Sequence, residues 1–154
     1  MFKKHKGFTL IELIVVIVIL GILAATALPK FLGIQSGARI STLQGARGAV
    51  ASAMNIAYAT QTSQGLASNV GITLDGVSIA MVNGYPAAVP ASGGALSGIY
   101  TAAGLSSDYS AVGTAAALSI NVVNAPTPTA CAFSYTAATA TTPPVVGAIV
   151  QSGC

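Results

Sequence analysis

Glu12 is the residue of this sequence whose surroundings raise the first chemical question. Between Phe8 and Leu28 it is the only charged side chain. A carboxylate at the centre of a bilayer costs on the order of 2.5–3.5 kcal/mol, and less near the end of the apolar run. One interpretation is therefore that Glu12 reaches the membrane interface. The other is that a cation pairs with it, because such a pair is much stronger in a low-dielectric helix bundle than in water.

Two cations are close enough in the sequence to pair with Glu12. Lys6 is available in the uncut chain. If the chain is cut after Gly7, Phe8 gains a free α-amine one helical turn before Glu12. The amine of the same chain or that of a neighbouring copy can then form the pair. A pair between copies would fix the register of one subunit against the next.

Cys131 and Cys154 are the other residues with distinctive chemistry. A short basic tail precedes the apolar run and predicts that the N-terminus stays in the cytoplasm, with the rest of the chain outside. Two cysteines near the C-terminus of an exported domain favour a disulfide. The alternative is a pair of buried free thiols.

The sequence offers no set of catalytic or metal-binding residues. His5 is the only histidine and lies in the basic tail, so the rest of the chain has no Ser-His or Cys-His pair and no usual zinc ligand set. The three acidic residues are scattered, and neither a Walker-type nor a GxGxxG loop is present. We therefore expect a protein that is not an enzyme and that uses no cofactor or metal.

The net charge of +3 comes from the tail. Beyond residue 7, Lys30, Arg39 and Arg47 balance the three acidic residues, so no basic patch for nucleic acid is expected. We expect the two arginines to be solvated or to make contacts between subunits. Only 6% of the residues are charged, and such a surface has little self-repulsion against copies of itself.

One long helix must position Glu12. Residues 8–28 reach roughly 31 Å as a helix, close to the ~30 Å hydrocarbon core of a bilayer. Gly21 is a weak point in this run, and Pro29 predicts a kink or break. Helical periodicity resumes over residues 29–62, where apolar residues recur at intervals of three and four along one stripe. The stripe consists of Leu43, Ala46, Val50, Ala53 and Ala57.

Residues 63–154 are expected to form a globular antiparallel β head, which gives an α+β fold. Asp75-Gly76 lies between two β-prone stretches and predicts a hairpin over residues 71–82. Residues 83–94 are typical of a loop, and residues 95–104 of a short helix. Strands are predicted over 118–123, 131–136 and 145–150. The five tyrosines favour packing over a sugar-binding surface.

The stretch KGFTLIEL, residues 6–13, followed by the apolar run to Pro29, resembles the N-terminus of type IV pilins and of type II secretion pseudopilins. The resemblance implies that residues 1–7 are a leader and that prepilin peptidase cuts between Gly7 and Phe8. Phe8 would then be N-methylated, and Glu12 would pair with the Phe8 amine of an adjacent subunit. The helix between Gly21 and Pro29 would be the stretch that loses hydrogen bonds in the filament.

Further features suggest a particular kind of pilin. Residues 29–53, 84–86 and 131–144 look most like mannose-sensitive haemagglutinin (MSHA) pilins, and Cys131 and Cys154 would bracket the family's C-terminal disulfide loop. Residues 87–125 carry no motif that can be placed. The expected partners are copies of the chain in a helical filament, the inner membrane before assembly, the prepilin peptidase/methylase, and assembly machinery with a separate ATPase.

This resemblance implies a major pilin subunit that forms extracellular filaments of a Gram-negative bacterium for adhesion and surface attachment. The nearest alternative is a type II secretion pseudopilin, although many pseudopilins stabilise their loop with a metal in place of a disulfide. An alternative of another class is a single-span, membrane-anchored binding protein that never polymerises.

Overall fold

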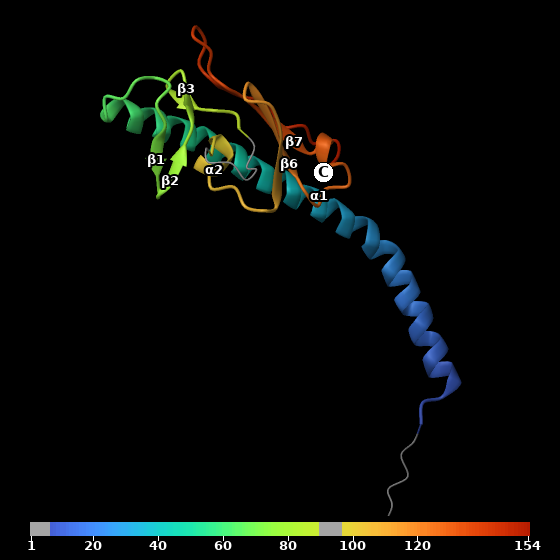
Figure 1. Cartoon of the computed structure of the whole chain (residues 1–154). Helices are drawn as coiled ribbons and strands as arrows, with labels where there is room; N and C mark the ends of the chain where they lie inside the picture. The colour runs from blue at the N-terminus through green and yellow to red at the C-terminus, as the bar shows by residue number, and fades with distance from the viewer. Residues whose placement is uncertain (1–6, 90–96) are drawn as a thin grey trace, which may run out of the picture. The chain divides into compact units, whose positions relative to one another are not determined.

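A computed structural model describes residues 7–89 and 97–154 and contains one long helix followed by short antiparallel strands (Figure 1). The long helix, α1, has 54 residues and spans Leu10–Ser63. The chain divides into two compact units, Met1–Gly37 and Ala38–Cys154, so their boundary falls inside α1. We call residues 10–37 of this helix the exposed half of α1, residues 38–63 the buried half, and Ala38–Cys154 the globular unit.

Among the described residues, the apolar side chains of the exposed half of α1 have no packing partner. Between Leu10 and Leu28 the large apolar residues are 46% to 75% exposed. α1 continues without interruption through Gly21 and Pro29, so the expected break at the proline is not present in the free chain. A proline removes one N–H donor, and the hydrogen bonds of neighbouring residues carry the helix past it. Loss of hydrogen bonds over this stretch on assembly stays a prediction.

The buried half of α1 places its apolar stripe in the core of the globular unit. The side chains of Leu43, Val50 and Ala57 are 0% exposed, and those of Ala46 and Ala53 are 5% exposed. Intervals of three and four residues keep these side chains on one side of a helix with 3.6 residues per turn. The predicted amphipathic pattern is confirmed for this stripe.

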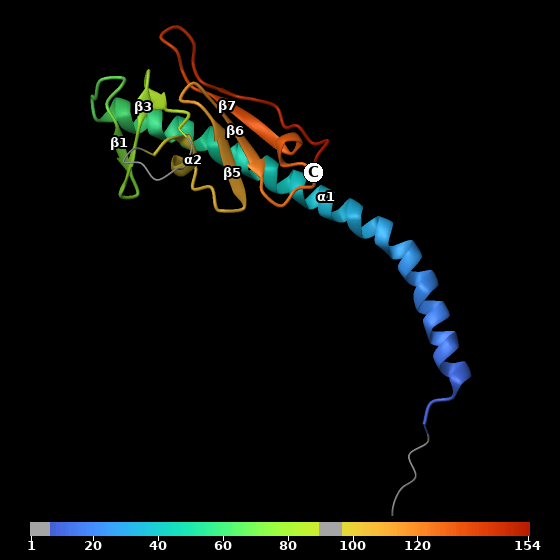
Figure 2. The ribbon, with the colours of Figure 1, turned by 45° about the vertical axis from the view of Figure 1, so that its right-hand side comes forward.

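A four-stranded antiparallel sheet packs against this stripe (Figures 1 and 2). Its strands follow one another in chain order: β5 (Tyr109–Gly113), β6 (Ala117–Val122), β7 (Ala132–Thr136) and β8 (Val145–Val146). Alternate residues of β6 and β7 face the core because side chains alternate along a strand. In the register, Leu118 is opposite Tyr135 and Ile120 is opposite Phe133, and all four are buried.

Two small hairpins complete the globular unit. The first pairs β1 (Ile72–Leu74) with β2 (Val77–Ile79), and the second pairs β3 (Met81–Val82) with β4 (Tyr85–Pro86). Both turns use two residues with positive φ, Asp75-Gly76 (49° and 80°) and Asn83-Gly84 (51° and 90°). Such angles match the type I′ turns that Asp-Gly and Asn-Gly favour.

The first hairpin confirms the prediction for residues 71–82, whereas the second corrects the loop predicted over 83–94. Tyr85–Pro86 forms a strand, and the Asn83-Gly84 pair is itself a hairpin signal. Residues 90–96 of the predicted loop lie outside the described residues. The short helix predicted within residues 95–104 is α2, Ile99–Ala102.

Other boundaries differ from the expectation. β6 and β7 closely match the strands predicted over 118–123 and 131–136. The strand predicted over 145–150 is reduced to the two residues of β8 and an isolated bridge between Val150 and Ala132. β5 was not predicted, and a short 3₁₀ helix, η1 (Pro128–Ala130), precedes β7. The α+β fold class is confirmed.

Candidate functional site

The expected processing site lies directly before α1. Gly7 and Phe8 have no regular secondary structure and are exposed, and the Phe8 side chain is 90% exposed. α1 begins two residues later, at Leu10. A peptide bond in exposed, non-helical backbone is accessible to a protease, because cleavage concentrates where the chain is exposed and not tied down by secondary structure.

Glu12 contacts a residue that the sequence interpretation did not assign to it. The Thr9 main-chain N–H donates to Glu12 Oε2 at 2.9 Å, and the Thr9 hydroxyl donates to the same oxygen at 2.7 Å. The Glu12 N–H lies 3.4 Å from the Thr9 hydroxyl oxygen. Thr9 and Glu12 therefore form a capping box. In this motif the residue just before the helix and the third residue of the helix each accept a hydrogen bond from the main-chain N–H of the other. The Thr-x-x-Glu spacing was a sequence signal for this contact.

This capping box places the carboxylate on an apolar surface. A shallow hollow lies on one side of the helix start. It is lined by residues spaced at intervals of three and one, namely Phe8, Ile11, Glu12, Val15 and Val16. Lys6, the partner expected in the uncut chain, lies outside the described residues. The expected pair with a free Phe8 amine stays a prediction, since Phe8 is joined to Gly7 in this chain.

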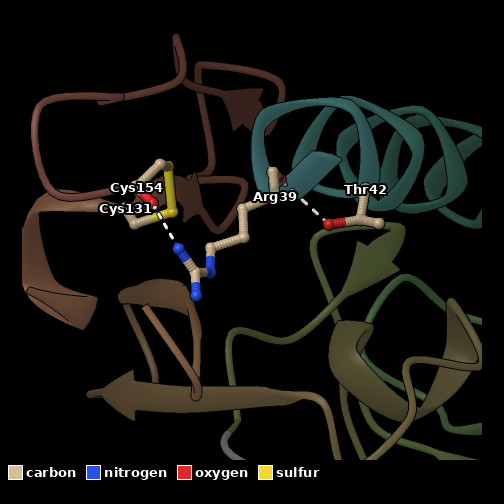
Figure 3. The surroundings of a disulfide bond; sticks show 4 residues. All are labelled: Arg39, Thr42, Cys131 and Cys154. Carbon is tan, nitrogen blue, oxygen red and sulfur yellow. Dashed lines mark hydrogen bonds between the residues drawn. A yellow bond between two sulfur atoms is a disulfide. The ribbon is translucent and has the colours of Figure 1, made fainter. Parts of the chain in front are cut away.

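Cys131 and Cys154 form the disulfide that the sequence favoured, with an S–S distance of 2.05 Å and a Cα–Cα distance of 4.8 Å (Figure 3). The two cysteines are separated by 23 positions in the sequence. Cys131 is 0% exposed and Cys154 is 7% exposed, so the bond lies inside the core cluster that contains Leu43. The alternative of two free thiols is wrong.

The two arginines of the buried half of α1 each donate a hydrogen bond to a main-chain oxygen of the globular unit, and the expectation that they are solvated or make contacts between subunits stays a prediction. The Nη1 of Arg39 donates to the main-chain oxygen of Cys154 at 2.9 Å (Figure 3). The Nε of Arg47 donates to the main-chain oxygen of Gly147 at 2.8 Å. No sequence pattern predicts such contacts, because every residue carries a main-chain carbonyl.

Three tyrosines join elements of the globular unit. The hydroxyl of Tyr135 donates to the main-chain oxygen of Pro86 at 2.7 Å, which links β7 to the second hairpin. The hydroxyl of Tyr109 donates to the main-chain oxygen of Thr42 at 2.9 Å and links β5 to α1. The hydroxyl of Tyr100 lies within 2.8 Å of main-chain oxygens of Ser106 and Tyr109.

Burial changes the acidity of two of these hydroxyls. Loss of solvation raises the pKa of Tyr135, and the nearby Tyr85 hydroxyl raises it further. Loss of solvation also raises the pKa of Tyr100, with smaller contributions from Asp108 and Tyr109. Both tyrosines therefore remain protonated at neutral pH and serve in packing. Tyr58 and Tyr85 stack with ring centroids 4.8 Å apart.

Within residues 7–89 and 97–154, no group of three or more His, Cys, Asp or Glu side chains lies close enough to hold a metal ion. By length and composition α1 is the one described helix that could cross a membrane, and its apolar window has no residue buried in the protein.

Known proteins resemble part of the chain. Residues 2–28 match the model of the prokaryotic N-terminal methylation motif. The chain is 46% identical over 61 residues to the type IV narrow pilus major component PilA5 of Thermus thermophilus, covering 40% of the chain and 49% of that protein. It is 41% identical over 70 residues to the type II secretion system core protein G of Pseudomonas aeruginosa, covering 42% of the chain and 49% of that protein.

These matches relate part of the chain to two kinds of protein. The chain carries an N-terminal methylation motif and is similar to both a type IV pilin and a pseudopilin. It spans about half the length of the curated relatives that it matches. No solved structure gives a significant match. The similarity is thus to both a type IV pilin and a type II secretion pseudopilin.

Proposed function

We propose that this chain is a structural subunit of a type IV pilus, an MSHA-like major pilin, which polymerises through residues 8–28. The observation that carries the proposal is the exposed half of α1. Its apolar side chains have no partner among the described residues, and most of them lie within the methylation motif of residues 2–28, which carries one carboxylate. A helix that is apolar on all sides needs a bilayer or other helices around it.

Processing would take place at the helix start. In the proposal, prepilin peptidase cuts between Gly7 and Phe8, and the new amine of Phe8 is methylated. The exposed, non-helical backbone at these two residues supports this assignment. The apolar segment remains in the mature chain, because the cut lies before it, unlike the cut of an ordinary secretory signal.

Assembly would use Glu12 as an attachment point for the next subunit. Both contacts with Thr9 use Oε2, which leaves Oε1 of the processed chain available for the Phe8 amine of a neighbouring copy. Transfer of the helix from lipid to a helix bundle gains little hydrophobic energy, because both surroundings are apolar. Packing and the charge pair must therefore supply the difference.

The proposed cellular path follows from this arrangement. The precursor lies in the inner membrane with its N-terminus in the cytoplasm and its globular unit in the periplasm. After processing, assembly machinery with a separate ATPase adds it to a filament outside a Gram-negative cell. The globular units then form the filament surface used for adhesion and surface attachment.

Electron microscopy of cells that express Glu12→Ala tests this function. We expect at least a roughly tenfold loss of surface filaments, because a lost charge pair in a low-dielectric bundle weakens every subunit contact. Membrane insertion should be unchanged, since the substitution makes the segment more apolar. Asp75→Asn is the matched control, because it removes a carboxylate from an exposed turn of the globular unit and asparagine tolerates the positive φ at this position. Normal filaments with Glu12→Ala would contradict the proposal.

A type II secretion pseudopilin is the second candidate, and the similarity to core protein G favours it. The disulfide that closes the C-terminal loop favours the pilin instead, given the metal-stabilised loops of many pseudopilins. Deletion of the gene separates the two. Loss of surface filaments supports the pilin, whereas normal filaments with a loss of protein secretion support the pseudopilin.

A membrane-anchored binding protein that never polymerises would behave differently from both. For such a protein, Glu12→Ala should leave its distribution and oligomeric state unchanged. Cross-linking in intact membranes before and after the substitution would reveal this outcome.

A further inference from the structure

The last ten residues, 145–154, which we call the C-terminal segment, are held mainly through their main chain. Val150 and Ala132 exchange two hydrogen bonds, of 2.8 and 3.2 Å. The N–H of Gly153 donates to the oxygen of Ala130 at 2.9 Å, and its carbonyl accepts from the N–H of Thr127 at 3.1 Å. A Cβ on Gly153 would meet Thr127 and Ala130, so the segment approaches η1 too closely for a side chain there.

Two side chains of α1 reach this segment from the other side. Arg39 binds the oxygen of Cys154, and Arg47 binds the oxygen of Gly147 and lies 3.5 Å from that of Val146. Arg39 is half-buried, whereas Arg47 is exposed. A guanidinium presents its donors in a rigid fork, so it orients an acceptor better than a flexible ammonium does. The contact of Arg39 falls on the same residue that supplies one sulfur of the disulfide.

Burial of the disulfide limits when the bond between the two sulfurs can form. With Cys131 fully buried and Cys154 nearly so, a donor molecule has no access to the sulfurs once the segment is docked. Thiol–disulfide exchange requires access of the attacking thiolate to a sulfur. The last exchange step must therefore occur before docking is complete, and contacts that bring the segment to its docked position also bring the two thiols together.

We propose that Arg39 is a positioning residue for formation of the Cys131–Cys154 disulfide, with Arg47 as a weaker second contact. Arg39 donates a hydrogen bond to the main-chain oxygen of Cys154 and holds this residue next to α1 before the sulfur–sulfur bond forms. The C-terminal segment thereby spends more time with the two thiols within reach of each other. This inference concerns the globular unit and does not depend on polymerisation, so its failure would leave the proposed function standing.

The chemistry is a two-electron thiol–disulfide exchange with a donor disulfide, such as a periplasmic oxidoreductase or oxidised glutathione. One cysteine thiolate attacks the donor, forms a mixed disulfide and releases one donor thiolate. The second cysteine thiolate then attacks the protein sulfur of the mixed disulfide and releases the other donor thiolate. The protein loses two electrons and two protons, and the donor becomes a dithiol or two thiols.

The proposal is tested by measuring the effective concentration of the two thiols relative to each other. The full chain in detergent micelles is equilibrated with reduced and oxidised glutathione, quenched with acid, and labelled with a maleimide that shifts its mass. We expect Arg39→Gln to lower the effective concentration about tenfold, because hydrogen bonds to charged groups are among the stronger ones in proteins. Arg47→Gln should lower it about threefold, since its contact is solvent-exposed.

Three control variants separate positioning from general effects. Lys30→Gln removes a positive charge from an exposed position of α1 and should leave the effective concentration of the two thiols unchanged. Ile79→Val weakens the packing of a buried residue in a separate core cluster, and it too should leave the value unchanged while the unit stays folded. Arg39→Lys keeps a donor without the fork and should give a value between those of the wild type and Arg39→Gln.

The comparison between Arg39→Gln and Ile79→Val decides the outcome. A lower effective concentration for Arg39→Gln alone supports the positioning role. If Arg39→Gln matches the wild type, or if Ile79→Val lowers the value equally, the arginine has no specific part in closing the bond and the proposal is overturned.

Discussion

The two halves of α1 are parts of one continuous helix, yet their apolar side chains meet opposite surroundings. Leu20 in the exposed half is 58% exposed, whereas Leu43 in the buried half is 0% exposed. Over residues 13–25 the exposed half is apolar around its whole circumference, whereas the buried half places a single apolar stripe in the core. The difference teaches that the width of the apolar surface, and not helix formation itself, decides whether a segment packs within its own chain.

Leucine-to-alanine substitutions in the two halves provide the most severe test of this comparison. Leu43→Ala removes a fully buried side chain and should lower the free energy of unfolding of the globular unit by about 2–5 kcal/mol. Chemical denaturation of the detergent-solubilised chain, monitored through tyrosine fluorescence, measures this loss.

Leu20→Ala is the matched substitution in the exposed half. It should leave unfolding of the globular unit unchanged, since the side chain is 58% exposed and has no partner among the described residues. Equal losses for the two variants would break the proposed division of α1.

Removal of the disulfide should affect the globular unit alone. Replacement of Cys131 and Cys154 by serine releases a loop closed across 23 positions and should cost about 3 kcal/mol of unfolding free energy. The same denaturation experiment measures this cost. The helicity and membrane insertion of the exposed half should remain those of the wild type, and a change in either would show coupling that the comparison excludes.

Alkaline pH should also weaken the globular unit selectively. Burial raises the pKa of Tyr135 and of Tyr100 above the ordinary value of about 10. The folded state therefore favours the protonated hydroxyls. Their contribution to stability is complete below pH ~10 and is lost as the pH rises through the raised pKa values. Thermal melts between neutral pH and pH 11 should show a falling midpoint.

Tyr135→Phe is the control for this pH effect. It should cost about 1 kcal/mol at neutral pH through the lost hydrogen bond to Pro86, and it should flatten the alkaline decline. An unchanged decline would mean that other groups control it.

The smallest expected effect is at the start of the exposed half. Thr9→Ala removes the hydroxyl of the capping box and should cost about 1 kcal/mol of local helix stability. Faster amide hydrogen exchange at residues 10–12 would report it, whereas exchange in the globular unit should not change. Thr9→Ser keeps the hydroxyl and should behave as the wild type.

Periodicity and turn chemistry were enough to predict much of the fold. The spacing of Leu43, Val50 and Ala57 predicted the buried stripe, because side chains three or four residues apart share one side of a helix. Asp75-Gly76 predicted the first hairpin, since both residues tolerate positive φ. The same rule applied to Asn83-Gly84 would have revealed the second.

Features that depend on partners distant in the sequence were not predictable. β5 contains Ser110, Ala111 and Gly113, which have weak strand preference, and its strand form comes from pairing with β6. The contacts of Arg39 and Arg47 use main-chain carbonyls, which leave no trace in residue identity. At the candidate site, the Thr9–Glu12 pair had a sequence signal, whereas the burial of the predicted disulfide did not.

Intact-mass analysis and N-terminal sequencing of filaments sheared from the cell surface test the central claim most directly. The account predicts a chain that begins at Phe8, with one methyl group on its amine and with the exposed half of α1 retained. A surface chain that still begins at Met1, or a protein found only as a monomer in the membrane, would contradict it.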